Sequence, residues 1–260
     1  MQHAEWGEPA PAPPDFLIGV DLGQRQDFTA VAVIERRQRP AANAPAPGPP
    51  SFIEELGLAP RPTGPTEAHY AVRWLERYPL DESYVRQVER TVGTVDRVRA
   101  LMPGKRPGRL ALIVDQTGAG QPVCDLFREA PALRGLEFSP ITITAGDVPS
   151  VDPRGGWRAP KRSIVAVLQV LLQSERLKVA AGLPAAETLR RELLGFRAKI
   201  TAAGNDVYAA GDDWLAIVAG SGLMAARRGR SPPAPTTISP NDVINESRGA
   251  SSHAMARRKT

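Results

Sequence analysis

Phe16-Leu-Ile-Gly-Val20 and Leu110-Ala-Leu-Ile-Val114 are two five-residue apolar runs, and each is followed at once by an aspartate, Asp21 or Asp115. An apolar run without alternating polar residues predicts a strand buried on both faces, as in a parallel sheet covered by helices. If the two strands are parallel neighbours, both aspartates reach the carboxyl edge of the sheet, where open α/β sheets bind ligands. Two buried carboxylates are costly unless they are compensated. The pair therefore predicts a site for a divalent cation.

Strands and helices are expected on either side of these two runs. Residues 29–36 are rich in β-branched side chains and predict a second strand that forms an antiparallel hairpin with the first. The glycine-rich segment 146–158 is expected to be a loop. The other expected strands are at 69–77, 139–144, 177–179, 199–201 and 207–209. The expected helices run from an N-cap at Asp81 to Leu101, from the end of Gly118-Ala-Gly120 to about Ala130, over 160–174, over 184–196 and from Asp212 to Arg227. Together they predict a mixed sheet with helices on both faces.

The domain limits follow from length and proline content. A chain of 260 residues with 42% hydrophobic and 23% charged residues is expected to form one domain plus tails. Residues 1–15 are proline-rich and predicted to be disordered, and 38–65 read as a proline-rich insertion. We therefore expect a folded domain over 16–227 and a tail over 228–260.

The net charge of +5 is confined to the end of the chain. Residues 227–260 contain seven basic and two acidic residues, so the preceding part is electroneutral. We expect this basic end to be solvated and disordered. Salt-sensitive contacts with phosphates are the alternative for it.

Compartment is indicated by cysteine usage and by the absence of targeting signals. Cys124 is the single cysteine, which excludes an internal disulfide and fits a reducing compartment. Its apolar surroundings predict a packed helix residue rather than a nucleophile. Glu5, Glu8 and several prolines stand where a signal peptide would need a basic start and an apolar core. We expect a cytoplasmic protein with no membrane contact.

A further carboxylate pair stands near the end of the expected domain, in Gly211-Asp-Asp-Trp-Leu215. Aspartate is a favoured N-cap and suits the positive end of a helix, which explains one member of the pair. Successive helix positions differ by about 100°, so Asp212 and Asp213 could divide the work between capping and facing the sheet edge. Three carboxylates at one edge can hold two hard cations about 3.5–4 Å apart, the arrangement used for phosphodiester cleavage.

Four segments in this order resemble the nuclease domain of phage terminase large subunits. They are Val20-Asp-Leu-Gly-Gln-Arg-Gln-Asp27, Val114-Asp-Gln-Thr-Gly-Ala-Gly120, Pro160-Lys-Arg-Ser163 and Gly211-Asp-Asp-Trp-Leu215. The resemblance covers residues 16–226. It implies an RNase H-like α/β fold, with a mixed five-stranded sheet flanked by helices on both faces.

The same resemblance implies a two-metal-ion-dependent DNA endonuclease that cuts concatemeric phage DNA during packaging. The implied catalytic residues and ligands of two Mg²⁺ or Mn²⁺ ions are Asp21, Asp115 and Asp212 or Asp213. The implied partners are double-stranded DNA and a separate packaging ATPase, small terminase subunit or portal, in the host-cell cytoplasm. The sequence holds no G-x-x-x-x-G-K-[ST] motif, so we expect no ATPase motor in this chain.

Basic residues close to the third of these segments are candidates for DNA contacts. Lys161 and Arg162 fall in the first turn of an expected helix, where the dipole disfavours cations but amide groups suit a phosphate. Arg158 lies in the loop before it and could also meet DNA. The alternative for all three is an exposed, salt-screened surface.

Two other functions remain open. Asp21-Leu-Gly23 and Asp115-Gln-Thr-Gly118 also resemble the paired phosphate loops of actin-like and sugar-kinase-like ATP phosphotransferases. A catalytically degenerate RNase H-like module that binds DNA or a partner without cutting is the non-enzymatic alternative.

Overall fold

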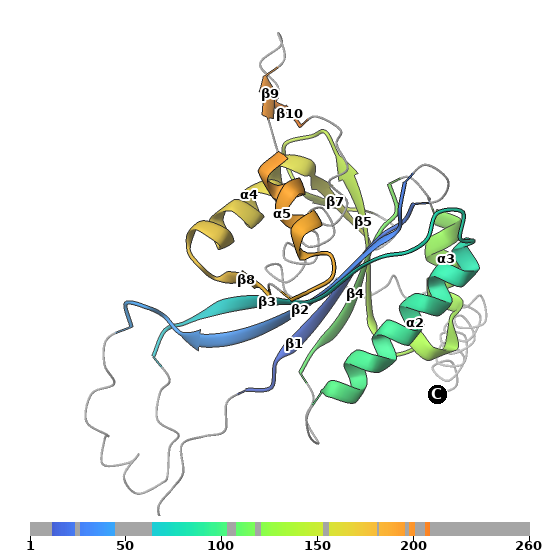
Figure 1. Cartoon of the computed structure of the whole chain (residues 1–260), viewed down its shortest axis with the longest axis horizontal. Coiled ribbons are helices and arrows are strands. Elements are labelled where there is room, and N and C mark those ends of the chain that lie inside the picture. The colour runs from blue at the N-terminus through green and yellow to red at the C-terminus, as the bar shows by residue number, and fades with distance from the viewer. Residues whose placement is uncertain are drawn as a thin grey trace, which may run out of the picture.

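The computed structural model describes residues 12–23, 27–44, 64–102, 108–117, 121–152, 156–180, 182–195, 198–200 and 206–208. Within these residues eight strands form one mixed sheet in the order β6-β7-β5-β4-β1-β2-β3-β8 (Figure 1). The strands are β1 (Asp15–Asp21), β2 (Ala30–Pro40), β3 (Thr66–Arg77), β4 (Leu110–Asp115), β5 (Glu137–Thr144), β6 (Ser150–Val151), β7 (Trp157–Pro160) and β8 (Leu177–Val179). A separate antiparallel pair joins β9 (Ala198–Ile200) to β10 (Asp206–Tyr208).

The centre of the sheet is parallel. Strands β1, β4, β5 and β7 are parallel neighbours, so their carboxyl ends share one edge. Strand β2 returns antiparallel to β1, which confirms the predicted hairpin, and β3 pairs antiparallel with β2. The apolar runs of β1 and β4 lie side by side and are buried, as the absence of alternation predicted.

Helices cover both faces of the sheet, as expected (Figure 1). On one face lie α2 (Tyr84–Leu101), α3 (Gln121–Glu129) and the 3₁₀ turn η1 (Pro131–Leu133); on the other lie α4 (Lys161–Gln173) and α5 (Ala186–Gly195). Ile18 and Val20 of β1 pack towards α2 and α3, whereas Leu17 packs towards α4 and α5. Cys124 is fully buried in α3, and burial raises the pKa of its thiol to about 11, which agrees with a packing role.

The expected five-stranded sheet is wrong, because eight strands form it. The segment 146–158, expected as a loop, contains all of β6 and the start of β7. Strand β7 was missed because Arg158 and Pro160 interrupt any apolar pattern. It forms because β5 and β6 both pair with it. Pro160 also precedes the first residue of α4, where its missing N–H costs little.

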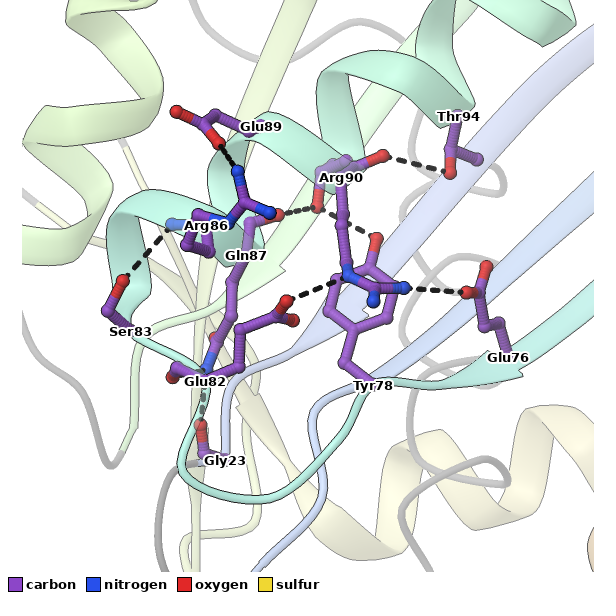
Figure 2. Close-up of polar contacts among 11 residues, drawn as sticks. Gly23, Glu76, Tyr78, Glu82, Ser83, Arg86, Gln87, Glu89, Arg90 and Thr94 are labelled. Atoms are coloured by element: carbon purple, nitrogen blue, oxygen red, sulfur yellow. Dashed lines mark hydrogen bonds and ion pairs between the residues drawn. The ribbon is translucent and has the colours of Figure 1, made fainter.

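The start of α2 also differs from the prediction. Ser83 caps the helix, and its side chain accepts a hydrogen bond from the Arg86 backbone N–H at 3.4 Å. Asp81, the expected cap, lies in the preceding turn with φ of 61°, a left-handed conformation that aspartate tolerates better than most residues. Arg90 Nε donates to Glu82 Oε1 at 2.8 Å, which ties this turn to the helix (Figure 2).

Several predictions concern residues outside the described part of the chain. These are the last helix with Asp212 and Asp213, the tail at 228–260, residues 1–11 and most of the insertion at 38–65. The domain limits therefore stay predictions. In the described residues, none of the helices combines the length and the apolar character needed to cross a membrane.

Candidate metal centre

Asp21 and Asp115 are direct neighbours across two parallel strands. The register of β1 with β4 pairs Asp21 with Asp115, the last residue of each strand. Adjacent strands are about 4.8 Å apart, which brings the two backbones within reach of one ion. Both residues are buried, with 6% and 8% of their surface exposed. The structure thus brings this pair together at the carboxyl edge, and their role as metal ligands stays a prediction.

The pair lies on the sheet face that α4 and α5 cover. Side chains alternate along a strand, and Leu17 of β1 and Ile113 of β4 belong to the core on that face. Asp115 is paired with Ile141 of β5, which is paired in turn with Trp157 of β7, so these residues form one row across the strands. Ile141 and Trp157 both pack into that core. The aspartates therefore replace apolar residues at the end of an otherwise hydrophobic row.

Asp115 is held in place by Thr117. Its Oδ1 accepts hydrogen bonds from the Thr117 backbone N–H at 2.8 Å and from the Thr117 hydroxyl. That hydroxyl oxygen in turn accepts a bond from the backbone N–H of Ile143 at 2.7 Å. Burial raises the pKa of Asp115 above its usual range although both Thr117 bonds oppose this. A cation at this edge would compensate the ionised carboxylate.

Sequence reasoning missed Thr117, although a signal was present. An aspartate side chain commonly bonds the backbone N–H two residues further on, and threonine here adds its hydroxyl. The same turn is attached to β5, because Gln116 donates its backbone N–H to the Ile141 carbonyl at 2.9 Å. Asp115 is consequently positioned by two neighbouring strands rather than by a loose loop.

The loop after Asp21 is closed by a buried hydrogen-bond network. Gly23 N–H donates to Thr29 Oγ1 at 3.0 Å, and the Thr29 hydroxyl donates back to the Gly23 carbonyl at 3.1 Å. Gln87 of α2, which is 1% exposed, donates its Nε2 to the same carbonyl at 2.9 Å (Figure 2). Sequence reasoning missed Thr29 and Gln87, since no local pattern reveals contacts between residues 6 and 64 positions apart.

Gly23→Ala is expected to destabilise the protein. A Cβ at Gly23 would lie 2.1 Å from the Asp27 carbonyl oxygen and 2.6 Å from the Phe28 carbonyl carbon, so the loop must move. Overpacking of this kind costs about 1–3 kcal/mol in the free energy of unfolding, measurable by urea titration. Gly93→Ala is the matched control: nothing lies within 4 Å of its added Cβ, and alanine favours a helix. Equal stability of the two variants would contradict the prediction.

The carboxylate oxygens of Asp21 and Asp115 are of the type that binds a hard divalent cation, but two carboxylates form only part of a metal centre. Carboxylate oxygens are the ligands that Mg²⁺ and Mn²⁺ prefer. Over the described ranges, no group of three or more His, Cys, Asp or Glu residues that could hold a metal comes together. The expected third ligand, Asp212 or Asp213, lies outside those ranges.

The three basic candidates divide between the faces of the sheet. Lys161 opens α4 directly after β7, at the carboxyl edge that also carries the aspartates. Arg162 follows it and pairs with Asp147 at 2.8 Å, which offsets its charge. Arg158 is exposed and alternates with Trp157, so it lies on the face opposite the two aspartates. All three therefore lie near the carboxyl edge, but Arg158 is on the face opposite the carboxylates.

The structure is similar to solved nucleases. The large terminase nuclease of thermophilic phage G20c, crystallised with bound magnesium, superposes with a TM-score of 0.50 at 18% identity, over 84% of this chain and 82% of that one. The chain has the fold of a terminase nuclease. No family model matches the sequence, and neither does any curated protein.

Two further similarities are more distant in shape. The large terminase nuclease domain of bacteriophage SPP1 with bound Mn matches at 9% identity and a TM-score of 0.44, over 82% of this chain and 86% of that chain. The Mn-soaked human cytomegalovirus terminase nuclease domain matches at 14% identity and a TM-score of 0.48, over 88% of this chain and 90% of that chain.

Proposed function

We propose that this protein is a metal-dependent endonuclease that hydrolyses phosphodiester bonds of double-stranded DNA. The observation that carries the proposal is the pairing of Asp21 with Asp115, both buried, at the carboxyl edge of a parallel sheet. Two buried carboxylates side by side repel each other when both are ionised, and a bound cation would offset that cost. The terminase nuclease fold supports the same chemistry, and the G20c nuclease of that fold was crystallised with magnesium.

Each residue has a defined part in this proposal. Asp21 and Asp115 would hold two Mg²⁺ or Mn²⁺ ions, with Asp212 or Asp213 as the third carboxylate ligand. When bound, the ions would lower the pKa of the attacking water and stabilise the leaving oxygen. Thr117 fixes the orientation of the Asp115 carboxylate. Lys161 stands at the same edge, where it could meet a phosphate of the substrate.

Its biological substrate in this proposal is concatemeric phage DNA during packaging. A separate packaging ATPase, a small terminase subunit or a portal would be its partners in the host-cell cytoplasm. The support for this context is the resemblance of four sequence segments to terminase nuclease domains, together with the shared fold.

Plasmid DNA is expected to be nicked and then linearised by the full chain in the presence of Mn²⁺ or Mg²⁺. No cleavage is expected in EDTA, since the carboxylates alone cannot activate water. The products are read on an agarose gel over time at several metal concentrations. Cleavage that persists in EDTA would contradict a metal-dependent mechanism, and intact plasmid at every metal concentration would contradict nuclease activity.

A catalytically degenerate module that binds DNA or a packaging partner is the second candidate. The described residues bring two potential metal ligands together, and such a module would need no third. Binding of duplex DNA without cleavage in Mn²⁺ would support it. The ATP phosphotransferase has less support, because the fold matches a nuclease.

A further inference from the structure

A cationic pocket lies on the outer part of β2, β3 and β8, away from the aspartates. Its volume is about 100 Å³, and it is lined by four basic side chains, Arg37, Arg39, Arg73 and Lys178, together with Glu35 and His69. Such a cluster is notable because residues 1–226 carry equal numbers of acidic and basic residues. The positive charge is therefore concentrated here by the fold and not by composition.

The pocket lies on the sheet face opposite Asp21 and Asp115. Val31 and Val33 of β2 pack into the core beneath α2, and Glu35, Arg37 and Arg39 continue their alternation along the strand. Ala30 pairs with Asp21. Glu35 is five residues further along β2, about 17 Å from that row. Ligands bound in this pocket therefore do not enter the candidate metal centre.

Arg73 lines the pocket and lies at a β-bulge. The register of β2 with β3 shifts from Val33 opposite Trp74 to Ile34 opposite Val72, which leaves Arg73 as an extra residue. Bulges redirect side chains and are frequent at functional sites. Arg73 Nε donates to Glu35 Oε2 at 2.5 Å, and Arg37 Nε bonds the other oxygen of the same carboxylate.

Glu35 organises the pocket rather than neutralising it. Its side chain is only 5% exposed and bonds both Arg37 and Arg73, whose own side chains remain 47% and 55% exposed. Burial alone would raise the pKa of Glu35, but the hydrogen bonds and charges of the two arginines hold it below its usual range. One carboxylate thus fixes two guanidinium groups, and Arg39 and Lys178 add further exposed positive charge.

We infer that this pocket binds the phosphate backbone of duplex DNA at a distance from the scissile bond. The inference rests on the proposed function, which supplies DNA as the substrate. Arg37 and Arg39 are two residues apart on a strand, about 6.8 Å, which equals the axial advance over two nucleotide steps of one DNA strand. Guanidinium groups held by a buried carboxylate are pre-organised for paired hydrogen bonds to phosphate oxygens.

The test compares two double variants of the full chain that remove the same charge. Arg39→Gln/Lys178→Gln alters the pocket and leaves both Glu35 ion pairs intact. Arg134→Gln/Arg191→Gln removes two exposed arginines after η1 and on α5. Binding of a fluorescent 40-base-pair duplex is measured by anisotropy in EDTA, across a salt series, so that no cleavage can occur.

The pocket variant is expected to bind at least 10-fold more weakly at low salt. Its slope of log affinity against log salt should fall by about two, whereas the control keeps the wild-type slope. Equal DNA binding by the two variants would overturn the DNA assignment. The assignment would also fail if the pocket variant lost as much affinity for polyglutamate, measured in the same way, as for DNA. A wild type that binds DNA through the pocket but cuts none in Mn²⁺ would refute the proposed function alone. Cleavage by wild type with unaltered binding by the pocket variant would refute the pocket alone.

Discussion

Asp115→Asn should reduce metal-dependent cleavage of plasmid DNA by at least about 100-fold, and Asp21→Asn should have the same effect. Loss of a group that only orients a metal ligand typically costs 10–100-fold, so loss of a ligand itself should cost no less. Asparagine keeps the size of the side chain and one oxygen but removes the charge that holds a divalent cation. Initial rates of nicking in Mn²⁺ measure the effect for each variant.

Asp96→Asn is the control for this experiment. Asp96 lies on α2, its side chain is 58% exposed, and it forms an ion pair with Arg99 of the same helix. Its replacement should leave the rate within twofold of wild type, because exposed pairs of this kind contribute little. Retained cleavage in Asp21→Asn and Asp115→Asn would remove both residues from the active site. Loss in only one of them would show that the other is not a required ligand.

Much of the sheet could be predicted because its central strands are buried on both faces. The runs that end at Asp21 and Asp115 contain no polar residue, and that pattern identified β1, β4 and the edge they share. The start of α4 was also predicted to within one residue, since proline is favoured immediately before or at a helix start. Local chemistry was sufficient at these positions.

The remaining features depend on contacts between distant segments. Strand β7 exists because β5 and β6 pair with it, although Arg158 and Pro160 obscure it in the sequence. The Gly23 network requires Gln87, 64 residues away. The cationic pocket joins side chains of β2, β3 and β8, which only the pairing of these strands brings together. Strand pairing and packing of this kind depend on tertiary contacts, which residue propensities and hydrophobic periodicity do not predict.

Metal-dependent stability is the second large effect that we expect. Mn²⁺ at 100 times its dissociation constant should raise the free energy of unfolding of the wild type by about 2.7 kcal/mol, because the ion binds the folded state alone. Asp115→Asn should abolish most of this gain. Thermal unfolding in EDTA and in a Mn²⁺ series measures it, with Asp96→Asn as a control that keeps the wild-type shift. A wild type whose melting temperature is unaffected by Mn²⁺ would contradict the metal centre.

In EDTA the same substitution should act in the opposite direction and make the protein more stable at neutral pH. Burial raises the pKa of Asp115 in the folded state above its unfolded value, so between these two values the folded state binds more protons than the unfolded state. Stability therefore falls as pH rises through that window, and asparagine removes this loss. Urea unfolding of both proteins from pH 4 to 8 should show the variant gaining on the wild type as pH rises. A variant that is less stable than wild type in EDTA at neutral pH would mean that Asp115 is a structural residue, because a carboxylate kept for metal binding is a cost to the metal-free fold.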